Sequence, residues 1–261
     1  MLLAIDIGNT HTVIGIFVNG RFKNHFRFYS RHTLTADECM MLLDQLLAQN
    51  KMQKEGFSGV IICSVVPDLT AIFQEAARKY FKTRPIVVNS DMDLNIRINY
   101  DLPHQVGADR IANAVAAYHL YGGPTIVVDL GTATTFDAIS KDGEYLGGAI
   151  APGIETSSAD LFRRAAQLYR VALEKPERAI GKNTTESLKS GIIFGAVGQM
   201  DEITRRIKKE LKGKVFVVAT GGLAGLVAKE SKTVNKTNPI LTLQGLKIIY
   251  DMITTKKKKR G

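Results

Sequence analysis

The apolar pattern of the first half of the chain predicts strands and helices in a mixed order. Two apolar runs separated by a short polar turn predict a hairpin, and a third run continues it as an antiparallel strand. Apolar positions at helical spacing then alternate with short continuous apolar runs, which are typical of buried parallel strands. The expected order is strand, strand, strand, helix, strand, helix, strand, over residues 2–17 (the whole hairpin), 21–29, 35–49, 59–66, 68–81 and 85–88.

The second half predicts a similar series after an intervening helix that begins near Gly107 and runs to Leu120. We expect a hairpin over 125–139, a strand entering a Gly/Pro bend over 143–154, helices over 155–166 and 184–211, a strand over 215–223 that ends in glycines, and a last helix over 239–253. These elements predict an N-terminal domain over 1–112, a C-terminal domain over 113–255, and a basic, disordered tail over 256–261.

The turn of the first hairpin carries an acid, a glycine and neutral hydrogen-bonding side chains. Gly8 lets the backbone approach phosphate oxygens, and successive N–H groups in such a turn can bind an anion. The negatively charged Asp6 would repel a phosphate, so it is better suited to the hydrated Mg²⁺ that accompanies ATP. Asn9 and Thr10 can form neutral hydrogen bonds. An ordinary hairpin, in which Asp6 and Thr10 satisfy the turn backbone, explains the same residues.

A second stretch repeats the order of residue types. Asp129 and Gly131 follow an apolar run, and each lies 123 residues after its counterpart, Asp6 or Gly8. One such hairpin in each half predicts two similar α/β halves that face each other across a nucleotide cleft.

An acid and a base begin the helix between the halves. Asp109 can accept a proton from an attacking hydroxyl, and Arg110 can hold an anionic substrate group. An aspartate in the first turn is also stabilised by the helix dipole, which explains it without catalysis. Spacing alone leaves both interpretations open.

Composition narrows the functional classes. The net charge of +10 raises nucleic acid as a partner, but residues 256–260 supply half of it and no aromatic residues are interleaved, so nucleic-acid binding is disfavoured. No apolar run approaches the length of a membrane span. Cys39 and Cys63 form no metal-type pair and indicate a reducing, cytoplasmic location, although two cysteines could also form a disulfide. Neither a Walker-type phosphate loop nor a dinucleotide G-x-G-x-x-G is present.

Six motifs in order resemble those of the type III pantothenate kinases. They are DIGNT at Asp6, YDLPHQVGADR from Tyr100, DLGTATT at Asp129, GGAIAPGI from Gly147, NT at Asn183 and TGGL at Thr220. The resemblance implies an α/β fold of two duplicated actin-like (ribonuclease H-like) domains with an interdomain nucleotide cleft. It also implies phosphorylation of pantothenate to 4′-phosphopantothenate by ATP, the first step of coenzyme A biosynthesis.

The resemblance assigns roles residue by residue. Asp109 would be the catalytic base, Asp6 would hold Mg²⁺ through water, and Asp129 would bind a monovalent cation, K⁺ or NH₄⁺. It implies a homodimer in which Thr184 is provided across the interface. The implied ATP-binding residues are Asp6, Ile7, Gly8, Asn9, Thr10, His11, Thr12, Val13 and Thr132. We add Gly221 and Gly222, which offer a bare backbone surface at a strand end. The implied pantothenate-binding residues are Tyr100, Gly107, Ala108, Asp109, Arg110 and Thr184.

Two other functions remain open. A different small-molecule kinase or phosphatase of the same fold would keep both hairpins without the stretch from Tyr100 to Arg110. A basic regulatory protein without turnover would instead show salt-sensitive DNA binding that depends on residues 256–260.

Overall fold

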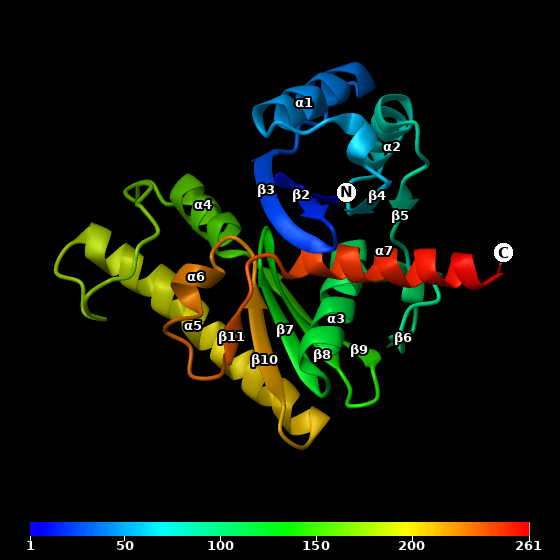
Figure 1. Ribbon diagram of the computed structural model, residues 1–261. Helices are drawn as coiled ribbons and strands as arrows, with labels where there is room; N and C mark the ends of the chain where they lie inside the picture. Colours follow the sequence, from blue (N-terminus) through cyan, green and yellow to red (C-terminus); the bar gives the residue numbers. More distant parts are fainter. Residues whose placement is uncertain (261) are drawn as a thin grey trace. The chain divides into compact units, whose positions relative to one another are not determined.

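The computed structural model describes the backbone of residues 1–260 and the side chains of residues 1–256 (Figure 1). The chain divides into two compact units. Unit 1 comprises Met1–Asn95, Asp101–Ala116 and the chain from Thr242 onward, and unit 2 comprises Ile96–Tyr100 and Ala117–Leu241.

Unit 1 is built on a five-stranded sheet of order β3-β2-β1-β4-β5. The first three strands are antiparallel, as the sequence predicts, and β4 and β5 continue the sheet in parallel with β1. The strands are β1 (Leu2–Ile7), β2 (His11–Val18), β3 (Arg21–Tyr29), β4 (Gly59–Ser64) and β5 (Ile86–Val87), and the helices are α1 (Ala36–Gln49), α2 (Pro67–Phe81), most of α3 (Ala108–Tyr121) and α7 (Leu241–Arg260), with short 3₁₀ turns at Lys54–Gly56 and Pro103–Gln105.

Local sequence explains where these helices begin. Thr35 caps α1 through its side chain, which accepts a hydrogen bond from the Glu38 backbone N–H (3.2 Å), while the Glu38 carboxylate accepts from the Thr35 N–H (2.8 Å). Pro67 occupies the first turn of α2, where its missing N–H is not needed. The buried faces of α1 and α2 then form one hydrophobic core with side chains from β1, β2 and β4.

Helix α7 covers another part of the unit 1 sheet, which is why the C-terminus groups with the N-terminal residues. Glycines make room for it: a Cβ on Gly15 would lie 2.8 Å from Leu243, one on Gly59 would lie 2.2 Å from the Tyr250 hydroxyl, and Gly245 packs against the backbone of Ala112. The division therefore differs from a single boundary after residue 112, which falls inside α3.

Unit 2 repeats the arrangement of unit 1 on a six-stranded sheet of order β11-β10-β7-β8-β9-β6. An antiparallel series β7-β8-β9 is again extended in parallel from its first strand, here by β10 and β11. The elements are β6 (Arg97–Ile98), β7 (Thr125–Leu130), β8 (Ala133–Ile139), β9 (Glu144–Pro152), α4 (Ile154–Arg164), α5 (Thr184–Leu211), β10 (Phe216–Thr220), α6 (Ala224–Val227) and β11 (Lys236–Thr237). The duplication predicted from the two hairpins is confirmed.

The expected basic tail is partly corrected. Helix α7 extends to Arg260, beyond the predicted end at residue 253. Lys256 lies in this helix, and its ammonium donates to the Asp93 carboxylate (2.6 Å) and carbonyl (2.9 Å). The side chains of residues 257–260, and residue 261, lie outside the described part of the chain.

Candidate functional site

The first candidate turn lies between β1 and β2 in unit 1. The Gly8 N–H donates to the His11 carbonyl (3.0 Å), and β1 pairs with β2 up to Ile7 and Thr12. The Ser30 hydroxyl, from the end of β3, donates to the Gly8 carbonyl (2.6 Å) and also pairs with the Thr12 hydroxyl (2.9 Å). This turn is therefore fixed by its own backbone and by Ser30, a contributor that the sequence analysis missed.

The predicted ATP-binding residues of this turn differ in what they can offer. Ile7 and Thr12 are fully buried, backbone included, so neither residue presents a group to solvent. Asn9 is exposed, and Gly8, Thr10, His11 and Val13 are partly buried. These five residues can present groups to a ligand from solvent without rearrangement.

Asp6 is the next-to-last residue of β1 and lies beside Cys63 of the parallel strand β4, with which it is in register. The buried Cys63 thiol donates a hydrogen bond to the Asp6 carboxylate (3.2 Å). Burial, reinforced by the negative charge of Asp109, raises the pKa of Asp6 to about 7, and the Cys63 hydrogen bond and the positive charge of Arg27 oppose that rise only partly. Neither Cys63 nor Arg27 was predicted, since nothing in the sequence reveals which strand neighbours β1.

Asp109 lies in the first turn of α3 and is brought to Asp6 within unit 1. Its carboxylate accepts from the Arg110 backbone N–H (2.8 Å), and a Cβ on Gly107 would lie 2.5 Å from the same carboxylate oxygen. Burial raises the pKa of Asp109, against hydrogen bonds from the backbone and the charge of the buried Arg110. Two carboxyl groups 103 positions apart in sequence therefore influence each other electrostatically, and each holds its proton more tightly than a carboxyl group in water.

The second candidate turn, in unit 2, is one residue shorter than the first. The Gly131 N–H donates to the Ala133 carbonyl (3.1 Å), and β7 pairs with β8 up to Leu130 and Thr134. The Thr132 carbonyl accepts from the Gly153 N–H (3.2 Å) and the Thr156 hydroxyl (2.8 Å), so the Gly/Pro bend packs beneath the turn.

Gly221 meets Asp129 in this unit. Strand β10 runs parallel to β7 with Thr220 opposite Asp129, and a Cβ on Gly221 would lie 2.6 Å from the Asp129 carboxylate and 2.6 Å from the Leu130 carbonyl. Two stretches that the sequence analysis treated separately thus form one site. Gly222, the next residue, is exposed.

We expect Gly221→Ala to lower the free energy of unfolding by about 1–3 kcal/mol, because Gly221 has a φ of +94° and no space for a Cβ. Turnover should fall as well, since Asp129 must move. Urea unfolding followed by circular dichroism measures the first effect, and a coupled assay the second. Gly225→Ala, in α6 with nothing near its Cβ, is the matched control and should change stability by less than about 1 kcal/mol; an equal loss in both variants would contradict the steric argument.

The remaining predicted substrate residues divide between the units. Gly107, Ala108 and Arg110 surround Asp109 in unit 1. Tyr100, in unit 2, packs edge-on against Tyr145 (ring centroids 6.2 Å apart). Thr184 is the first residue of α5 and is exposed, next to the Asn183 side chain that caps the helix by accepting from the Glu186 N–H (2.9 Å).

Within residues 1–256, no three His, Cys, Asp or Glu side chains come together as a metal-binding group. A cation at either turn would therefore rely on one or two carboxylates together with ligand oxygens. In the part of the chain that the structure describes, no helix is long and apolar enough to span a membrane.

Comparisons with known proteins identify the family of this chain. Residues 2–206 match the family model described as type III pantothenate kinase. A protein of Moorella thermoacetica named type III pantothenate kinase is 49% identical over 254 residues, covering 97% of this chain and all of the relative.

Solved structures at low identity show the fold. A Baf family transcriptional activator from Campylobacter jejuni is 20% identical, with 97% of this chain and 99% of that chain covered and a TM-score of 0.59. A ROK family glucokinase from Streptomyces griseus, crystallised with glucose and AMPPNP, is 13% identical, with 96% and 98% covered and a TM-score of 0.51. The expected fold, α/β with two actin-like domains, is thereby confirmed.

Proposed function

Because this chain belongs to the type III pantothenate kinase family, it phosphorylates pantothenate with ATP in coenzyme A biosynthesis, and we propose which residues carry out the transfer. The observation that supports the proposal most directly is the electrostatic effect of Asp109 on Asp6, both of which lie in unit 1. One carboxylate suits a phosphate-bound cation and the other suits the attacking alcohol.

Asp109 acts as the general base. The 4′-hydroxyl oxygen of pantothenate attacks the γ-phosphorus of ATP, the bond from that phosphorus to the β–γ bridging oxygen breaks, ADP leaves, and the hydroxyl proton passes to Asp109. The raised pKa of Asp109 makes its carboxylate a stronger proton acceptor than an exposed aspartate. Arg110, buried beside it, offers a positive charge to an anionic group of the substrate.

Asp6 holds the divalent cation through water, and this assignment fits the donor set. Burial and a second acid raise the pKa of Asp6 to about 7 because both disfavour its ionised form. A nearby cation would stabilise that ionised form. Bound Mg²⁺ neutralises phosphate charge during transfer. The backbone of the first turn, from Ile7 to Val13, and Thr132, Gly221 and Gly222 of unit 2 bind the nucleotide.

Pantothenate is bound by Tyr100, by the stretch from Gly107 to Arg110, and by Thr184. Thr184 is exposed at the start of α5, which is consistent with its serving the site of a partner in a homodimer. We also propose a cytoplasmic location, consistent with the two buried free thiols, Cys39 and Cys63, and no role in nucleic-acid binding.

Asp129 binds the monovalent cation, K⁺ or NH₄⁺. We expect replacement of K⁺ by Na⁺ to lower turnover by about tenfold or more, because a cation of the wrong size places the carboxylate and phosphate oxygens badly. Asp129→Asn should be slow in either salt and should lose the difference between them. Initial rates at constant ionic strength measure this, and equal rates of the unsubstituted protein in K⁺ and Na⁺ would remove the site.

A coupled assay with pantothenate, ATP, Mg²⁺ and K⁺, with mass spectrometry of the product, tests the function itself. The expected product carries one phosphate on the alcohol of pantothenate. A sugar or acetate phosphorylated in preference to pantothenate would instead indicate another kinase of this fold.

A further inference from the structure

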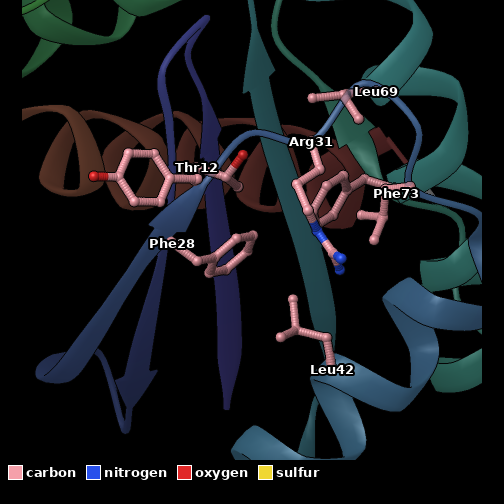
Figure 2. Close-up of a pocket in the computed structure, with 8 residues that line it drawn as sticks. Thr12, Phe28, Arg31, Leu42, Leu69 and Phe73 are labelled. Atoms are coloured by element: carbon pink, nitrogen blue, oxygen red, sulfur yellow. The ribbon is translucent and has the colours of Figure 1, made fainter.

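A cavity of about 240 Å³ lies in unit 1 and shares only Thr12 with the residues assigned to ATP and pantothenate. Figure 2 shows its walls, which come from β2, β3, α1, α2 and the segment between β3 and α1. Most of the wall is apolar: Phe28, Leu34, Leu42, Leu69 and Phe73. An apolar cavity of roughly 150 Å³ can hold benzene, so this one has room for a ring and a short chain.

Arg31 is the one charged residue that lines this cavity. In Figure 2 its guanidinium points into the space between Phe28 and Leu42. Among the described side chains the Arg31 guanidinium has no hydrogen-bond or salt-bridge partner, and its charge acts at longer range on Glu38, whose pKa it helps to lower. Arg31 is exposed, so its donors stand where the cavity opens to solvent. A guanidinium matches a carboxylate with two parallel hydrogen bonds.

We propose that this cavity binds a small apolar monocarboxylate, with the carboxylate on Arg31 and an aromatic ring or a chain of about six to eight carbons among the apolar walls. Pantothenate does not fit this description, because Thr12 and Tyr29 are the only other lining residues with polar side chains. Its amide and two hydroxyls would lose most of their hydrogen bonds there.

The cavity touches the turn to which we assign ATP. Thr12 lines the cavity and pairs with the Ser30 hydroxyl (2.9 Å), which in turn donates to the Gly8 carbonyl (2.6 Å). Tyr29, another lining residue, packs on the His11 ring with centroids 5.0 Å apart. A bound acid therefore alters ATP affinity. This coupling rests on the proposed function, but the binding of the acid itself does not depend on it.

Isothermal titration of the full-length chain with phenylacetate and with octanoate tests the binding. We expect dissociation constants between about 10 µM and 1 mM, and at least about tenfold weaker binding of the neutral isostere 2-phenylacetamide. Arg31→Gln should weaken phenylacetate to the level of the amide, and Leu42→Trp should fill the cavity and abolish binding of both. Arg21→Gln, at an exposed arginine that begins β3 and does not line the cavity, is the matched control and should bind normally.

Three results would overturn the site: no heat with the unsubstituted protein up to about 10 mM acid, equal affinity for acid and amide, or unchanged affinity in Arg31→Gln. A second titration measures ATP affinity with and without saturating phenylacetate. A change in ATP affinity of about threefold or more supports the coupling. Acid affinity, measured with and without ATP, should then change by the same factor. Acid binding that leaves ATP affinity unchanged overturns the coupling alone. Since neither titration requires turnover, failure of the kinase assignment would be recognised separately.

Discussion

Asp109→Asn is expected to lower turnover by a factor on the order of 10² or more while ATP binding is retained. The amide keeps the shape of the side chain and can still accept from the Arg110 N–H, but it cannot take the proton of the alcohol. Its effect should therefore appear in kcat. A coupled assay measures kcat, and isothermal titration with ATP and Mg²⁺ measures binding.

Asp68→Asn provides the matched control for this variant. Asp68 also lies in the first turn of a helix, α2, so both substitutions remove a negative charge that favours a helix N-terminus. Asp68 is exposed, and its variant should keep normal turnover. Near-normal turnover in Asp109→Asn would exclude Asp109 as the base, and an equal loss in both variants would point to helix stability.

Asp6→Asn should abolish most turnover and yet stabilise the protein without nucleotide or metal. Because the folded protein raises the pKa of Asp6 to about 7, the ionised carboxylate at pH 8 destabilises the folded state relative to the unfolded chain. An amide removes that charge and still accepts the Cys63 hydrogen bond. We expect a gain of about 2–4 kcal/mol at pH 8, measured by urea unfolding in the presence of a chelator.

The pH dependence gives an independent measurement of the same effect. In the unfolded chain Asp6 titrates near pH 3.9, so between about pH 4 and pH 7 the folded protein binds the extra proton and its Asp6-dependent stability falls as pH rises. The difference between the two proteins should be near zero at pH 4, grow up to pH 7 and then stay constant. A variant that is less stable than the unsubstituted protein at pH 8 would contradict the raised pKa.

Much of the fold can be predicted from the sequence, because local patterns determine it. The boundaries of α5 agree with the prediction at both ends, and the repeated acid-glycine hairpins identify the duplication. The two-residue strands β6 and β11 were missed, because so short a segment has no periodicity of its own.

Contacts between distant segments could not be predicted. The Cys63 thiol reaches Asp6 only because β4 pairs with β1 in parallel, and Gly221 reaches Asp129 only because β10 pairs with β7. Neither pairing can be predicted from the spacing of apolar and polar residues within a single strand. The same is true of α7, whose place in unit 1 depends on the glycines Gly15 and Gly59, more than 180 positions earlier in the sequence.

This placement of α7 has a consequence for biosynthesis. The ribosome makes the strands of unit 1 first and the helix that packs on Gly15 and Gly59 last, with nearly all of unit 2 in between. The apolar surface of the unit 1 sheet that α7 covers therefore stays exposed in the nascent chain until translation ends. A premature stop codon immediately before Thr242 would release a chain that contains both candidate turns but lacks the helix that completes the first of its two units.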